Sequence, residues 1–138
     1  MNEPRQEQFY QIGRTGCYFE SIIHIAEDET GRYIDSYRIY LEMIRSGAIG
    51  KDCYVFDPDT LMSLLTGKKW AMTKENAAYL CKPGEREVIR FEWQEVSTLH
   101  GHFVVGDTKG GIEYDPFPGC NVVANGKVVS KRIFRRVA

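Results

Sequence analysis

The segment "HGHFVVGDTKGGIEYDP", residues 100–116, has the pattern of a β-hairpin. Two stretches rich in apolar residues flank a turn that contains several glycines and Asp107, a residue type that closes turns through local hydrogen bonds. Pro116 ends the second stretch because proline cannot donate to a strand ladder. The segment therefore predicts two antiparallel strands.

The same segment brings two chemically capable side chains together. If the loop comprises Asp107 to Gly110, His102 lies directly opposite Asp115, with Cβ atoms roughly 4.5–5.5 Å apart. A two-residue loop, Lys109–Gly110, makes the two residues diagonal neighbours on one face, whereas an odd loop without a bulge separates them. A carboxylate beside a histidine fixes the tautomer of the ring and stabilises its protonated form. Taken on its own, the pair favours a structural contact at the end of a sheet over a catalytic one.

The rest of the chain predicts helices first and strands afterwards. Capping and periodicity indicate helices from Thr15 or Gly16 to about Glu27, from Asp35 or Ser36 to Gly47, and from Asp57 to Gly67. Alternation of β-branched and aromatic residues indicates strands in "KKWAM", "REVIRFEW", "HGHFVVGD", "GIEYDP" and "KVVSKRIFRRV". A run of helices followed by a run of strands predicts an α+β fold with helices packed on an antiparallel sheet.

Composition narrows the classes of function. The chain has 138 residues and a formal net charge of −1, which favours one domain over residues 1–138 and argues against nucleic acid as a partner. We find no membrane-spanning stretch and no signal-peptide pattern. We therefore expect a cytoplasmic location and no insertion into a membrane. The four cysteines are widely spaced, which predicts free thiols, and neither a metal nor a cofactor is expected. The oligomeric state is not predicted.

Cys17 stands in "QIGRTGCYFESIIHIA", residues 11–26, where a turn-like stretch leads into an amphipathic helix. A helix N-terminus or a protonated histidine lowers the pKa of a thiol and makes it a better nucleophile at neutral pH. The alternative is a buried core thiol, which is the interpretation for Cys53, Cys81 and Cys120. If the start of the helix faces the strand of His102, Cys17 gains a base from a distant segment.

The residues Gln11 and Cys17, followed by "GHFVVGD" and "YDP", resemble the papain-like cysteine peptidases. In pattern they are most similar to the C39 group, the double-glycine leader peptidases of bacteriocin exporters. The resemblance implies a papain-like fold in which Cys17 is the nucleophile, His102 the general base and acid, Asp115 the orienting carboxylate and Gln11 the oxyanion donor. His100 is the alternative base.

The resemblance also sets the expected function and its alternatives. We expect a cysteine peptidase or amidase that hydrolyses a peptide or isopeptide bond, with a peptide or a peptidoglycan stem as substrate. The chain differs from the C39 pattern at Gly16 and Tyr18, which flank the cysteine. Residues 46–67 resemble small proteins of phages and bacterial mobile elements, so the alternatives are a catalytically silent binding module, a cell-wall peptide amidase and a transglutaminase-like acyltransferase.

Overall fold

The computed structural model describes residues 16–50 and 53–137. Within them, three helices come first along the chain, four strands follow, and a short helix precedes the last strand. The helices are α2 (Cys17–Thr30), α3 (Ser36–Ser46), α4 (Pro58–Thr66) and α5 (Asn121–Asn125). The strands are β1 (Trp70–Asn76), β2 (Arg86–Glu95), β3 (Thr98–Gly106), β4 (Ile112–Tyr114) and β5 (Lys127–Arg136).

Local signals set the ends of the three longer helices. The Asp57 carboxylate accepts a hydrogen bond from the Thr60 backbone N–H (3.1 Å) at the start of α4, and Gly67 ends that helix with a φ of 70°. All three predicted helices are present, as α2, α3 and α4, so these predictions are confirmed. The first one extends beyond its predicted end near Glu27, because the chain turns only at Gly31, where φ is 67°.

The strands form one antiparallel sheet in the order β1-β5-β2-β3-β4. This sheet, with its helices, confirms the α+β class and all five predicted strands. The short helix α5 is not predicted by the sequence. It lies between two segments with turn composition, "PFPG" and "ANGK", and is too short to show a helical period of apolar residues.

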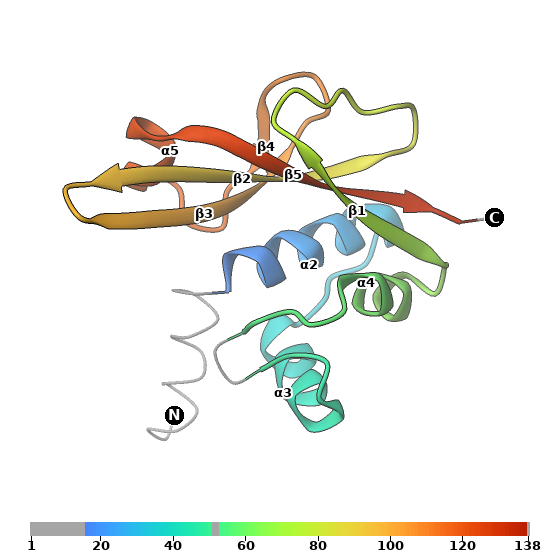
Figure 1. Cartoon of the computed structure of the whole chain (residues 1–138). Helices are drawn as coiled ribbons and strands as arrows, with labels where there is room; N and C mark the ends of the chain where they lie inside the picture. Colours follow the sequence, from blue (N-terminus) through green and yellow to red (C-terminus); the bar gives the residue numbers. More distant parts are fainter. Residues whose placement is uncertain (1–15, 51–52, 138) are drawn as a thin grey trace.

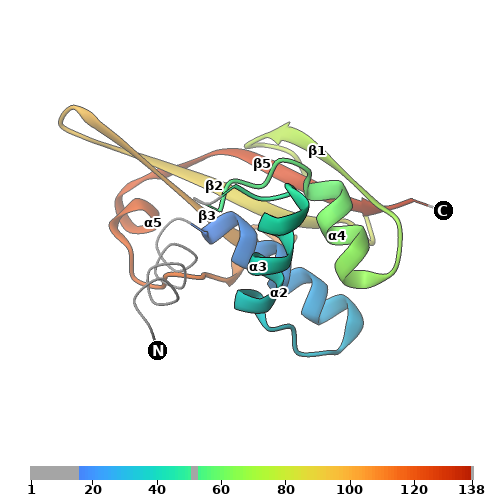
Figure 2. The same cartoon turned by 90° about the horizontal axis from the view of Figure 1, so that it is seen from below.

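Helices α2, α3 and α4 lie on one face of the sheet (Figure 1). Figure 1 shows α2 lying along that face, with α3 and α4 on its other side, and Figure 2 shows the same layers from below. The core between the layers includes these fully buried side chains: Phe19, Ile22, Ile25, Val88 and Phe134. Packing of this apolar face fixes α2 over β3, which determines where the first turn of α2 lies. None of the helices described is long and apolar enough to cross a membrane.

The β3–β4 hairpin differs from its predicted register. Val105 pairs with Tyr114 and Gly106 pairs with Ile112, and a bulge lies between the two pairs. These pairs leave five residues in the loop, so the loops of four and of two residues considered from the sequence are both wrong. An odd loop would place the following residues on the opposite face, but the bulge compensates for it.

Two carboxylates explain this loop. Asp107 accepts hydrogen bonds from the backbone N–H groups of Lys109 (2.7 Å) and Gly111 (2.8 Å), which closes the turn. Glu87, which is 1% exposed and belongs to the neighbouring strand β2, accepts one from the Thr108 N–H (2.7 Å). The loop is therefore held partly by a residue distant in sequence.

Candidate active site

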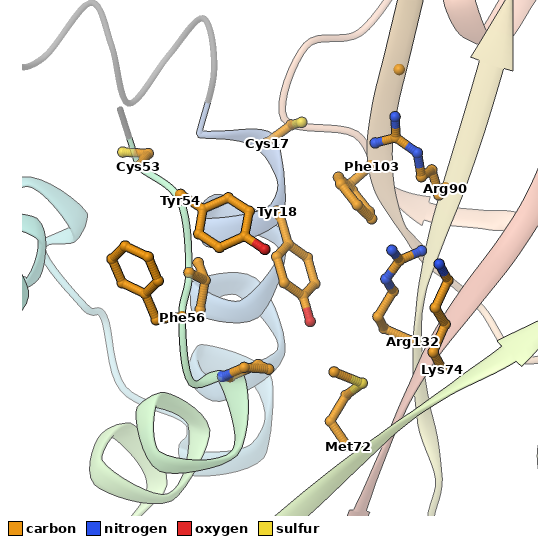
Figure 3. A pocket seen from close by; sticks show the side chains of 13 residues that line it. Cys17, Tyr18, Cys53, Tyr54, Phe56, Met72, Lys74, Arg90, Phe103 and Arg132 are labelled. Atoms are coloured by element: carbon orange, nitrogen blue, oxygen red, sulfur yellow. The ribbon is translucent and has the colours of Figure 1, made fainter. Parts of the chain in front are cut away.

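Cys17 is the first residue of α2 and directly follows the N-cap residue Gly16. Figure 3 shows its sulfur pointing from the start of the helix toward β3. The backbone N–H groups of Phe103 and Tyr18 donate hydrogen bonds to the sulfur, and the partial positive charge of the helix N-terminus acts in the same direction. The environment of Cys17 therefore stabilises a thiolate.

His102 lies on β3, is 6% exposed, and pairs with Asp115. Its Nε2 is 2.6 Å from Oδ1 of Asp115, and the same oxygen accepts a hydrogen bond from the Phe117 N–H (2.8 Å). Because His102 also hydrogen-bonds the Cys17 sulfur, Nδ1 is the ring nitrogen left for the sulfur. The structure thus brings Cys17, His102 and Asp115 together from three separate segments.

The pKa values of the thiol and the imidazole shift toward each other. Burial alone would raise the pKa of Cys17, but the hydrogen bond from His102, the backbone donor Phe103 and the charge of His102 together lower it. Burial likewise acts to lower the pKa of His102, yet hydrogen bonds and charges from Cys17 and Asp115 raise it. Each group therefore favours the ionised form of the other, which is the condition for a thiolate–imidazolium pair.

The expected oxyanion donors are the Gln11 side chain and the Cys17 backbone. Gln11 lies outside the described residues. The Cys17 N–H occupies the first position of α2, where a backbone N–H has no acceptor within the helix. That N–H can therefore donate to an oxygen atom that develops charge next to the sulfur.

The other two histidines have structural contacts. Nε2 of His100, the alternative base, lies 3.3 Å from Oε1 of Glu95 near the exposed end of the β2–β3 hairpin. Nε2 of His24 lies 3.1 Å from Oε2 of Glu113, and its ring stacks on Tyr114 with centroids 4.2 Å apart. The structure therefore places His102, rather than His100, beside Cys17 and Asp115.

The remaining cysteines differ in their surroundings. Cys53 is buried, as predicted, whereas Cys81 and Cys120 are only partly buried, so the prediction of core thiols is wrong for these two. Both lie in connections between elements, which run over the surface of proteins. Burial and the charges of Glu87 and Glu85 raise the pKa of Cys81 to about 11.

Cys120 is a neighbour of the site that the sequence did not reveal. Its sulfur lies with ligand atoms of His102 and Asp115 in a cluster whose members are all within 4.8 Å of one another. Imidazole, carboxylate and thiolate are the ligand types that Zn²⁺ binds. The signal that could have found Cys120 is its position shortly after Asp115 in the sequence.

A metal ion bound by this cluster would coordinate Nε2 of His102 and so replace its hydrogen bond to Asp115. We therefore expect micromolar Zn²⁺ to slow alkylation of Cys17 and EDTA to restore the rate. Replacing Cys120 with serine should weaken the effect, because the site would lose one of its three ligands. Mass spectrometry after timed alkylation measures this. An unchanged zinc response in the Cys120→Ser protein would exclude Cys120 as a ligand.

A cavity of about 650 Å³ opens beside Cys17. Aromatic side chains, including Tyr54 and Phe56, form one wall, and cations from the sheet form the other (Figure 3). The cavity is therefore the space in which a substrate can lie against the sulfur. The sequence did not reveal it, because its two walls come from segments far apart along the chain.

Comparisons with known proteins give a family. No curated protein and no solved structure matches the chain. The family described as "Protein of unknown function, DUF261" matches residues 1–136, which is nearly the whole sequence. The chain therefore belongs to the DUF261 family.

Proposed function

We propose that this protein is a papain-like cysteine hydrolase that cleaves a peptide or isopeptide bond. One observation carries the proposal: the Cys17 sulfur accepts a hydrogen bond from His102, whose second ring nitrogen is 2.6 Å from the largely buried carboxylate of Asp115. Nucleophile, base and orienting acid are thus linked in the order that acyl transfer requires.

The arrangement of elements also supports the papain-like part of the proposal. Cys17 begins a helix whose apolar face packs on an antiparallel sheet, and His102 lies on a strand of that sheet. The chain order of cysteine, histidine and aspartate is the one that the resemblance to the C39 group implies. A relationship to that group remains part of the proposal.

The proposed reaction has two steps. The Cys17 thiolate attacks the carbonyl carbon, and the Cys17 N–H, with the Gln11 amide expected from the sequence, stabilises the oxyanion. Imidazolium His102 then donates its Nδ1 proton to the leaving amine as the C–N bond breaks, which leaves a thioester. Neutral His102 next takes a proton from water, whose oxygen attacks the thioester and releases the carboxylic acid and the thiolate.

Competitive alkylation tests the state of the thiol. Because the pKa of Cys17 is lowered while that of Cys81 is raised to about 11, we expect iodoacetamide at about pH 6.5 to modify Cys17 at least about tenfold faster than Cys81. Mass spectrometry of peptides after timed quenching gives the four rates in one sample. Cys53 and Cys120 serve as further internal references.

The His102→Ala protein supplies the matching control. Without imidazolium, the Cys17 rate should fall toward that of an ordinary thiol and should rise only above about pH 8. If Cys17 reacts no faster than the other three cysteines, and His102→Ala changes nothing, the hydrolase proposal is wrong.

A further inference from the structure

We propose that the cavity beside Cys17 binds the acidic side chain, Asp or Glu, of a peptide substrate. The inference rests on the proposed function for the role of Cys17, and it names the class of substrate. Three features carry it: a cluster of cations on one wall, an apolar aromatic wall opposite, and a buried hydroxyl group without a partner between them.

The cations come from three neighbouring strands. Lys74 of β1 is directly paired with Arg132 of β5, and Arg90 of β2 is paired with Ser130, two residues before Arg132. The guanidinium carbons of Arg90 and Arg132 lie 5.1 and 4.9 Å from the centre of one ring, that of Phe103. The charge of Arg90 acts unfavourably on that of Arg132, so an anion placed among these cations would be bound favourably.

Carboxylates within the protein compensate this charge only in part. Nε of Arg90 lies 3.0 Å from Oε2 of Glu92. Arg132 donates to the Ser130 hydroxyl (2.6 Å), and neither it nor Lys74 has a carboxylate partner among the residues described. Burial and the charge of Arg90 lower the pKa of Arg132, as expected for a cation that lacks an anion.

Gly101 leaves room for one of these cations. It lies on β3 immediately before the histidine of the site and lines the cavity. A Cβ atom at this position would overlap the guanidinium group of Arg90. The absence of a side chain at Gly101 therefore allows Arg90 to lie across β3, where it lines the same cavity as Cys17.

The opposite wall provides aromatic surface, and Tyr18 places a hydroxyl group between the two walls (Figure 3). Tyr54 and Phe56 are 63% and 60% exposed, and their ring centroids are 5.1 Å apart. Tyr18 packs on Phe103 with ring centroids 4.7 Å apart, and within the described structure its buried hydroxyl has no hydrogen-bond partner. Burial raises the pKa of Tyr18, so its hydroxyl stays protonated and can donate to a carboxylate.

A peptide fits this cavity better than a nucleic acid does. About 650 Å³ is the size of a small-molecule site and accommodates a few side chains. The cations gather in one recess, and the chain has a net charge of −1, whereas nucleic-acid binding relies on many phosphate contacts along an extended basic surface. A side chain held in the recess would bring its own backbone carbonyl close to the Cys17 sulfur.

Binding to the Cys17→Ala protein tests the inference without turnover. The probes are N-acetylated pentapeptide amides of sequence Gly-Phe-Glu-Gly-Gly, with Gln or Lys replacing Glu in two counterparts. We expect calorimetry to show that the Glu peptide binds about tenfold more tightly than the Gln peptide, because charged hydrogen bonds are stronger than neutral ones. The Lys peptide should bind most weakly.

Variants that remove one positive charge show which cations bind the Glu side chain. Lys74→Gln changes an exposed residue and should lower the preference for Glu over Gln about threefold, and Arg132→Gln should lower it further. Lys109→Gln is the matched control, since Lys109 is an exposed cation in the β3–β4 loop, outside the cavity lining. Circular dichroism and thermal unfolding confirm that each variant is folded.

The possible outcomes separate the two proposals. If the Glu peptide binds preferentially but the wild-type protein does not cleave it, the binding site stands and the hydrolase proposal fails. Equal binding of the Glu and Gln peptides, or an equal loss of preference in Lys109→Gln, overturns the binding site. Tighter binding of a single-stranded RNA decamer that Lys74→Gln abolishes would also overturn it.

Discussion

Replacing His102 with alanine is expected to lower the hydrolysis of a peptide amide by about 10² to 10⁴-fold near neutral pH. The substitution removes the group that stabilises the Cys17 thiolate and that protonates the leaving amine. Release of aminocoumarin from acetyl-Gly-Phe-Glu-coumarylamide, or from its Gln counterpart, gives the rate by fluorescence. The Cys17→Ala protein should release none, since it has no nucleophile.

The shifted pKa values of Cys17 and His102 determine how the rate of hydrolysis should depend on pH. Because the pKa of Cys17 is lowered, wild-type activity should rise at a pH below the ordinary thiol value of about 8.5. It should fall again when the pH passes the raised pKa of His102, where the imidazolium loses the proton that the amine needs. A bell-shaped profile is therefore expected for the wild type. In His102→Ala the alkaline limb should disappear, and the remaining rise should move up toward the ordinary thiol pKa.

His100→Ala is the matched control for this experiment. It removes the same side chain from the same strand, but His100 is partly exposed and pairs with Glu95. Its rate should stay within about threefold of the wild type, as expected for a surface substitution. A His102→Ala rate equal to that of the wild type, or an equal loss in His100→Ala, would contradict the assigned roles.

Replacing Phe19 with alanine is expected to lower the free energy of unfolding by about 3–5 kcal/mol. Phe19 is fully buried on α2 and meets Tyr40 of α3 edge-on, with ring centroids 6.4 Å apart. Its loss would leave a cavity between the helices, in the layer that fixes α2 on the sheet. Urea unfolding followed by circular dichroism measures the change.

Phe56→Ala is the control for the stability experiment. Phe56 is 60% exposed, so the same truncation should cost less than about 1 kcal/mol. A similar loss in both variants would show that burial of Phe19 does not control stability. A change of less than about 1 kcal/mol in Phe19→Ala would contradict the packing of α2.

The helices were predictable because their signals are local. Asp57, Pro58 and Gly67 lie at the ends of α4 and act within a few residues of chain. The hairpin loop was predicted wrongly because part of its support comes from Glu87 on the neighbouring strand. A contact between segments far apart in sequence leaves no local pattern.

The candidate site was predictable only in part. Cys17, His102 and Asp115 are of residue types whose chemistry is recognisable, and their order along the chain suggested the site. The cations Lys74 and Arg132 looked like ordinary strand residues, since only the strand order β1-β5-β2 shows that they are neighbours of Arg90.

The position of β5 also determines when the site can form during synthesis. Among the described strands, β5 leaves the ribosome after the other four, yet it lies between β1 and β2 and pairs with both. Until it emerges, β1 lacks its partner and one edge of β2 is open to other chains. The contacts that β5 completes are non-local and therefore slow to form. Phe134 of β5 also belongs to the core on which α2 packs, so the surface that positions Cys17 is complete only once β5 has paired.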